Sequence, residues 1–175
     1  MPGMRSKESS QDKDMTKIED IKKEYLQAAK KHKLPDFDKL DEMFEVRAAN
    51  LENGRLLNSV IRLIINTMNG HVDNLYAVVN PSQNSVYSML LSGKLNDKDK
   101  DAINKLYYEM VALQLDAVQA LLCDDNTKAS YIEKIYKSYP MFRKEMILWI
   151  KKFSVAWQDI IKEYNNNEKK RGFLS

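Results

Sequence analysis

The sequence predicts an all-α protein, an antiparallel up-and-down helical bundle of about five long and two short helices. The chain of 175 residues contains only five glycines and four prolines, whereas sheet-rich folds need such residues at frequent turns. Apolar side chains recur at steps of three and four residues, the spacing of one face of an α-helix. Short polar or proline-containing segments separate these stretches, so consecutive helices should be antiparallel neighbours.

The first two helices are indicated by capping residues. Thr16 and Glu19 fit a capping box, which predicts a helix over residues 16–32. Asp36 then caps a short second helix, and we expect a break near residues 48–53. The apolar residues of the second helix are Phe37, Leu40, Met43 and Phe44.

The longest apolar pattern predicts a third helix over residues 57–79. Its apolar positions are Leu57, Val60, Ile61, Ile64, Met68, Val72, Leu75 and Val79. Pro81 ends this helix, and Ser82 or Asn84 starts a short fourth helix that stops at Gly93. The apolar residues of the fourth helix are Val86, Met89 and Leu90.

The fifth helix, which begins at Asp97, is apolar on two faces. The first face contains Ile103, Leu106, Tyr107, Met110, Ala117, Val118 and Leu121. The second face contains Val111, Leu115 and Leu122. A helix with two apolar faces usually lies centrally and packs against more than one neighbour. We therefore expect the fifth helix to form the centre of the bundle.

A turn at residues 124–126 leads into a sixth helix, which Pro140 separates from a seventh. The sixth carries Tyr131, Ile132, Ile135, Tyr136 and Tyr139. The seventh carries Phe142, Met146, Trp149, Ile150, Phe153, Trp157, Ile160, Ile161 and Tyr164. Residues 165–167, which are three asparagines, end it.

The predicted domain organisation is simple. Residues 1–14 form a disordered leader, 15–165 a single helical-bundle domain and 166–175 a basic flexible tail. No apolar stretch reaches the ~18–20 residues that span a bilayer, so we expect a cytoplasmic protein without a transmembrane segment. Cys123 is the single cysteine, which excludes an intramolecular disulfide and favours a reducing compartment. We expect its thiol to be partly buried and inert.

Charge is distributed unevenly along the chain. Residues 1–34 hold nine Lys and Arg against six Asp and Glu, residues 35–125 eight against fourteen, and residues 126–175 eleven against five. The basic ends can neutralise the acidic middle within the bundle. Alternatively, they form a basic surface for nucleic acid or acidic partners.

Motifs for chemistry are missing from the sequence. A di-iron bundle site needs Glu-x-x-His pairs, but Ala29 and Met68 stand three residues before His32 and His71. Nucleophile elbows and glycine-rich phosphate loops are absent as well. The sequence therefore predicts no catalytic residue, no metal ligand and no cofactor. The acids Asp38, Asp41, Glu42 and Glu45 predict a solvated helix face, with weak divalent-cation binding as the alternative.

His71 and Gln114 are the polar residues that fall within apolar stripes. We expect His71 to be a histidine at the edge of the core with one hydrogen bond. The alternative is a pocket base, which would require a carboxylate from another helix. Gln114 either finds a hydrogen-bond partner or lines a cleft.

Trp149, Phe153 and Trp157 form one ridge along the predicted seventh helix, which indicates core or a protein interface. A candidate basic surface surrounds it and consists of Lys134, Lys137, Arg143, Lys144, Lys151 and Lys152. Basic residues beside exposed aromatic rings suit single-stranded nucleic acid. A basic amphipathic helix can also lie on an anionic membrane or enter a groove on a partner.

A resemblance covers residues 34–163. It rests on Leu34-Pro35-Asp36-Phe37, Leu40, Phe44-Glu45-Val46, Asn80-Pro81, the acids of 97–101 and Leu106-Tyr107-Tyr108-Glu109-Met110. These segments are similar to a family of uncharacterised archaeal all-helical proteins. Because that family has no established activity, the resemblance implies the helical fold and transfers no site residues.

Three functions remain open. The first is a non-enzymatic protein–protein interaction or assembly module, in which the Trp149–Trp157 ridge docks a partner helix or forms a homodimer. The second is a nucleic-acid-associated protein that uses the basic C-terminal helices. The third is an enzyme with a site near His71.

Overall fold

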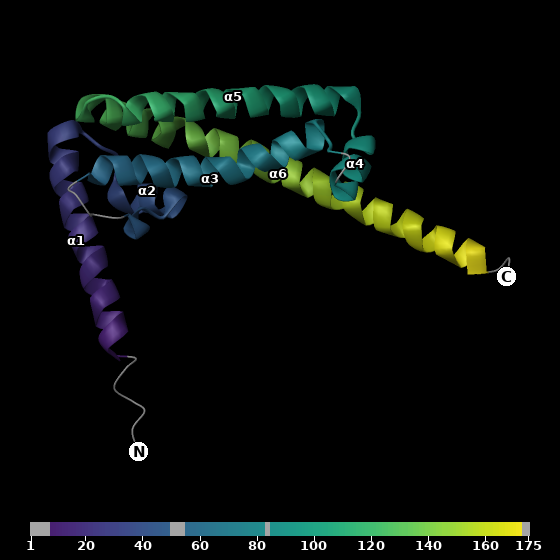
Figure 1. The fold of residues 1–175 in the computed structure, drawn as a ribbon, viewed down its shortest axis with the longest axis horizontal. Coiled ribbons are helices and arrows are strands. Elements are labelled where there is room, and N and C mark those ends of the chain that lie inside the picture. Colours follow the sequence, from purple (N-terminus) through teal and green to yellow (C-terminus); the bar gives the residue numbers. More distant parts are fainter. Residues whose placement is uncertain (1–7, 50–54, 83–84, 173–175) are drawn as a thin grey trace, which may run out of the picture. The chain divides into compact units, whose positions relative to one another are not determined.

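The structure, a computed structural model, describes residues 8–49, 55–82 and 85–172, with side chains for 18–49, 55–82 and 85–166. Every element in these ranges is a helix, which confirms the all-α prediction (Figure 1). The elements are α1 (Glu8–His32), α2 (Phe37–Phe44), the 3-10 helix η1 (Val46–Ala48), α3 (Leu56–Val79), α4 (Val86–Gly93), α5 (Asp97–Leu121) and α6 (Asp125–Gly172).

The described residues form two compact units. Unit 1 takes its residues from 1–68 and 113–137, and unit 2 takes its residues from 69–112 and 138–175. Unit 1 therefore holds α1, α2 and η1 together with the first half of α3, the last part of α5 and the start of α6. Unit 2 holds α4 and the remaining parts of the three long helices.

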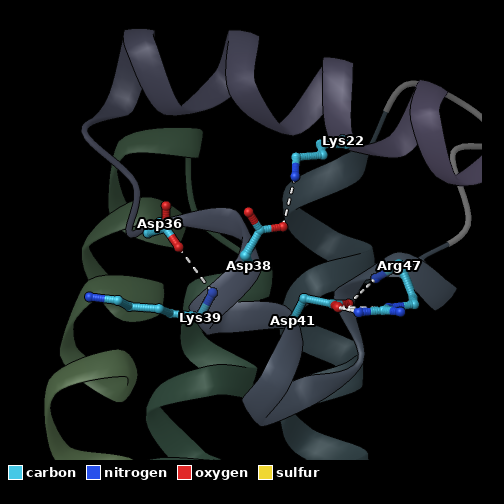
Figure 2. Close-up of polar contacts among 6 residues, drawn as sticks. All are labelled: Lys22, Asp36, Asp38, Lys39, Asp41 and Arg47. Atoms are coloured by element: carbon cyan, nitrogen blue, oxygen red, sulfur yellow. Dashed lines mark hydrogen bonds and ion pairs between the residues drawn. The ribbon is translucent and has the colours of Figure 1, made fainter.

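In unit 1, Tyr25 of α1 contacts the turn that leads into α2 and the first residue of that helix. The hydroxyl of the fully buried Tyr25 donates a hydrogen bond to the carbonyl of Pro35 at 2.9 Å. Its ring meets the edge of Phe37 at 5.3 Å between centroids. The carboxylate of Asp36 accepts from the backbone N–H of Lys39 at 3.0 Å, which confirms the predicted cap (Figure 2).

Asp41 is buried rather than solvated, which corrects the prediction for this acid. Only 3% of Asp41 is exposed, and its carboxylate accepts hydrogen bonds from the backbone N–H of Arg47 at 2.7 Å and from its Nε at 2.6 Å. A further bond comes from Nη2 of Arg47 (Figure 2). Glu45 at φ 53° turns the chain back, so that Arg47 reaches the preceding helix. The neighbouring Asp38 points outward and pairs with Lys22 at 2.7 Å.

The core of unit 1 comes from all its helices. Its fully buried side chains include Ile21, Leu40, Val46, Val60, Ile61, Ile64, Met68, Ala117, Ile132 and Ile135. Asp124 caps α6 by accepting from the N–H groups of Asn126 and Thr127. This tight turn makes α5 and α6 antiparallel neighbours, and Lys134 pairs with Asp116 across them at 2.7 Å.

The core of unit 2 is apolar and aromatic. It includes Leu75, Val78, Leu91, Ile103, Leu106, Met110, Phe142, Met146 and Phe153. Helix α4 turns a different face toward the core than its apolar residues predict. Its exposed residues are Val86, Met89 and Leu90, whereas Ser88, Leu91 and Ser92 are buried. Its cap is Ser85, which accepts from the N–H of Ser88 at 3.2 Å. The predicted start at Ser82 is therefore wrong, and the alternative start, Asn84, lies outside the described residues.

The long helices extend beyond their predicted ends. α1 begins at Glu8 instead of Thr16, because no glycine or proline interrupts residues 8–15. Helix α6 continues through Pro140, so the predicted break is wrong. Proline inside a helix costs ~3 kcal/mol, but Tyr139 and Phe142 are buried on either side, and each buried aromatic residue contributes about 1.5–3 kcal/mol.

The C-terminal end of α6 likewise passes the three asparagines at 165–167 and reaches Gly172. Asparagine lowers helix propensity by less than ~0.7 kcal/mol per residue, so three of them do not stop a long helix. The predicted break near 48–53 falls mostly on residues 50–54, which lie outside the described residues. Only Ala48 and Ala49 of the predicted break are described: Ala48 ends η1, and Ala49 follows it outside any helix.

Candidate functional site

The predicted ridge on α6 belongs to unit 2 and is largely covered by the chain itself. Phe153 is buried, and Trp149 and Trp157 are half-buried. The Trp157 ring lies 5.0 Å from that of Tyr87 on α4, and the Trp149 ring lies 6.1 Å from that of Phe153. The ridge therefore packs mainly within unit 2.

A small apolar groove remains beside the ridge. It has a volume of about 290 Å³ and is lined by Asn74, Ala77, Val78, Tyr87, Met146, Ile150, Phe153, Ser154 and Trp157. Two of the three predicted interface residues, Phe153 and Trp157, thus contribute to a concave surface. Trp149 is not among the lining residues.

The candidate basic surface is partly neutralised by acids. Lys134 pairs with Asp116, and Lys137 pairs with Glu133 at 2.7 Å. Lys152 pairs with Asp99 at 2.5 Å. The other three basic residues, Arg143, Lys144 and Lys151, are exposed. Two aromatic residues that could have stacked on bases, Tyr131 and Tyr139, are buried in the core.

His71 lies at the edge of the unit 2 core with a hydrogen bond, as predicted. One of its ring nitrogens, Nε2, is 3.1 Å from the hydroxyl of Tyr139. Burial lowers the pKa of His71, and the nearby Arg143 cation lowers it further. The charged group that acts on His71 is therefore a cation, whereas the pocket-base alternative required a carboxylate. Gln114 is half-buried and lies in unit 1.

The second apolar face of α5 is exposed, which corrects the expectation that α5 packs on both faces. The exposed fractions are 66% for Tyr108, 65% for Leu115, 52% for Val118 and 84% for Leu122, and Val111 is half-buried. Leu115, Val118 and Leu122 lie in unit 1, and we call these three residues the outer seam. The opposite face of α5, which includes Leu106 and Met110, is buried. Sequence spacing found Val111, Leu115 and Leu122 but did not show that they would be uncovered. It also placed Val118 on the core-facing side of α5, which is wrong because Val118 is 52% exposed.

Cys123 directly follows the outer seam and is exposed, so the expectation of a partly buried thiol is wrong. Asp125 opens the next helix after only one further residue, so Cys123 sits in the turn between two helices. Residues in such short connections usually lie at the surface. The thiol is therefore available to a chemical cross-linker.

The residues that the structure describes contain neither a metal-binding cluster nor a helix that could cross a membrane. No group of three or more His, Cys, Asp or Glu side chains there could hold a metal ion. Within the same residues, no helix is both long and apolar enough to cross a bilayer. Comparison with protein-family models, curated proteins and solved structures found no match. The resemblance to archaeal helical proteins therefore stays a prediction.

Proposed function

We propose that this chain is a non-enzymatic assembly module in which the outer seam of α5 pairs with the outer seam of a second copy. The observation that carries the proposal is the exposure of Leu115, Val118 and Leu122, each by more than half. Contiguous exposed apolar surface of this kind marks interaction sites.

The outer seam has the spacing of a coiled-coil interface. Leu115, Val118 and Leu122 follow one another at steps of three and four, which is the spacing of the a and d positions of a heptad repeat. Two apolar heptad faces pack by inserting each side chain into a hole on the partner helix.

A second copy is the occupant that the charge pattern favours. The seam contains no charged residue, so two identical seams do not repel each other. At 100° per residue, Lys105, Glu109 and Asp116 lie about a quarter turn or more around α5 from the seam axis. A patch that meets its own copy forms a closed two-fold dimer, the commonest oligomer of soluble proteins.

The two other functions have weaker support. Nucleic-acid binding would rely on a basic surface of which three lysines are already paired with acids. An enzyme site near His71 would need a carboxylate partner, but the charged group that acts on His71 is the Arg143 cation. Neither alternative accounts for the exposed outer seam.

Leu115→Glu is expected to prevent self-association. Burying an unpaired carboxylate in each half of an apolar interface costs several kcal/mol, which weakens a dimer by roughly 100-fold or more. Sedimentation velocity over a wide range of protein concentration measures this change. The wild-type chain should shift from monomer to dimer with increasing concentration, and the variant should remain a monomer.

Val118→Glu and Val155→Glu form a matched pair for the same measurement. Both valines are exposed, by 52% and 63%, and both lie on long helices, but only Val118 belongs to the outer seam. Val118→Glu should behave like Leu115→Glu, whereas Val155→Glu should dimerise like the wild type. A wild-type chain that stays monomeric throughout, or equal loss in both variants, contradicts the proposal. Cross-linking through Cys123 then reports direction, because only parallel seams bring the two thiols together.

A further inference from the structure

An apolar stripe on α6 runs through the groove of unit 2 and continues beyond it toward the C-terminus. The stripe consists of Ile147, Ile150, Ser154, Trp157 and Ile161, which follow one another at steps of three, four, three and four. This is the spacing of the a and d positions of a heptad repeat, the pattern by which one helix receives the side chains of another. We call these five residues the α6 stripe.

The α6 stripe is only partly covered by the chain itself. The exposed fractions are 44% for Ile147, 50% for Ile150 and 38% for Ile161, and Ser154 is exposed as well. Soluble proteins rarely leave large apolar side chains exposed in a continuous patch unless a partner covers them. The stripe therefore marks an interface that is separate from the outer seam of α5.

The groove gives the middle of the α6 stripe the depth that a docked helix needs. Its walls come from three helices of unit 2: α6 contributes Ile150, Ser154 and Trp157 of the stripe, α4 contributes Tyr87, and α3 contributes Asn74, Ala77 and Val78. Ser154 is the smallest side chain of the stripe. A large aliphatic side chain of a partner can therefore enter the groove at this position, as in the recognition of an amphipathic helix by an apolar groove.

Charge beside the α6 stripe favours an acidic partner. None of the groove-lining residues is charged. On one side of the stripe, the flanking g positions hold the buried Met146 and Phe153. On the other side, the e positions hold Lys144 and Lys151, which are exposed, and no ion pair in the described part of the chain holds either of them. The acid of α3, Asp73, is exposed and does not line the groove.

Other occupants fit this groove less well. Two copies of the α6 stripe would bring Lys144 and Lys151 of both chains to one interface, where like charges weaken association. Nucleic acid needs cations for its phosphates and open rings for its bases. The lining has no cation, and the half-buried Trp157 already packs against Tyr87 at 5.0 Å between ring centroids.

We propose that this groove docks one amphipathic helix of a different protein. That helix carries large aliphatic side chains at its a and d positions, which cover the α6 stripe and enter the groove beside Ser154. It carries aspartate or glutamate along the edge that faces Lys144 and Lys151. The partner is thus defined by an apolar heptad face with one acidic flank.

Fluorescence anisotropy with labelled synthetic peptides tests the proposal on the full chain. The acidic probe is a three-heptad helix with isoleucine at a, leucine at d and glutamate at e and g, whose like charges keep it from pairing with itself. The basic probe has lysine in place of each glutamate. The acidic probe should bind saturably and about tenfold more tightly than the basic probe, because two exposed ion pairs become like-charge contacts in the basic complex. Equal affinity for the two probes, or no saturable binding of the acidic one, would overturn the proposal.

Ile150→Glu and Leu148→Glu are matched variants, because the two residues are 50% and 59% exposed on the same helix but only Ile150 lines the groove. Ile150→Glu should reduce the affinity for the acidic probe by roughly tenfold or more, since it places a carboxylate in an apolar interface. Leu148→Glu should leave the affinity unchanged. Ser154→Phe makes a second test from an exposed position, because the added ring fills the groove and should block the probe. Binding that survives both Ile150→Glu and Ser154→Phe would refute the groove as the site.

Reversing the two flanking charges should reverse the preference between the probes. The combined variant Lys144→Glu and Lys151→Glu should bind the basic probe more tightly than the acidic one. The control combines Lys98→Glu and Lys105→Glu, which are exposed positions on α5 and change the net charge by the same amount. The control should keep the wild-type preference. The same reversal in both combinations would show general charge attraction and contradict the assigned edge.

Trp157 reports where the probe binds. The chain has two tryptophans, so Trp157 is the only one that remains in Trp149→Phe. Its emission should move to shorter wavelength when the acidic probe, which contains no tryptophan, excludes water from the groove. Leu115→Glu, which disrupts the outer seam, should bind this probe like the wild type. Binding without an emission shift, or loss of binding in Leu115→Glu, would place the probe outside the groove, and neither result bears on self-association through α5.

Discussion

Replacing Leu106 with aspartate is expected to abolish the cooperative unfolding transition of the protein. Leu106 is 2% exposed in the core of unit 2. Truncating such a leucine costs about 2–5 kcal/mol, and an unpaired buried carboxylate adds several kcal/mol more. Native domains are stable by only about 5–15 kcal/mol, so the two terms together consume most or all of the available stability.

Thermal unfolding followed by circular dichroism measures the effect. Wild-type protein should lose its helical signal in a sigmoidal transition, and Leu106→Asp should show a broad, non-cooperative decline. Leu148→Asp is the matched control, because Leu148 is 59% exposed and the same exchange there buries nothing. A melt of Leu106→Asp that overlays the wild-type melt would refute the core assignment. Ile64→Asp makes the equivalent test in unit 1, where Ile64 is fully buried.

The burial of Leu106 and Ile64 could be predicted because both lie in long helices. Over six or seven turns, many apolar positions together define the buried face, even where a single residue deviates from it. The sequence therefore predicts the core-facing side of α3 and α5. Helix α4 has only eight residues, Val86–Gly93. Its three apolar side chains predicted one face, but the small Ser88 and Ser92 allow close approach of the neighbouring helices and occupy the buried face instead.

Helix α5 shows a different limit of sequence patterns. Spacing correctly indicated a second apolar face at Leu115 and Leu122, but spacing does not state whether a neighbouring helix covers that face. Only the packed structure shows that both leucines are exposed. Likewise, Lys31, Arg55 and Asp125 line one cleft in unit 1 although they come from three distant parts of the chain. No local motif connects residues that are brought together by tertiary packing alone.

Asp41 was missed because its partner depends on a backbone turn. Spacing placed Asp41 with Asp38 and Glu42 on a solvated face, and Arg47 lies beyond the end of that helix. Glu45, with φ 53° and ψ 45°, adopts the left-handed conformation and redirects the chain. A non-glycine residue in this conformation is uncommon, and neither propensity nor spacing predicts it at Glu45.

Asp41→Ala is expected to lower the free energy of unfolding by ~2–3 kcal/mol. The carboxylate of Asp41 accepts three hydrogen bonds that join α2 to η1. A hydrogen bond to a charged group contributes about 1.5–3 kcal/mol, and the two bonds from the Arg47 side chain add little to this because that side chain is 62% exposed to solvent. Urea unfolding at neutral pH measures the loss. Asp38→Ala is the control on the same helix, since Asp38 is exposed and surface ion pairs contribute ~0–1 kcal/mol. Equal losses in both variants would contradict the special role of Asp41.

The Asp41 contribution should also disappear in acid. Burial alone raises the pKa of Asp41, but the hydrogen bonds from the Arg47 side chain and amide outweigh burial and hold the pKa below its ordinary 3.8. The unfolded chain therefore binds the Asp41 proton more tightly than the folded chain does. The stabilisation from Asp41 is fully present above pH 3.8, and it is lost as the pH falls from 3.8 through the lower pKa of Asp41 in the folded protein. The stability difference between wild type and Asp41→Asn should consequently shrink with decreasing pH. A difference that stays constant down to pH values below 3.8 would show that folding does not lower the pKa of Asp41, and a difference that grows with decreasing pH would show that folding raises it.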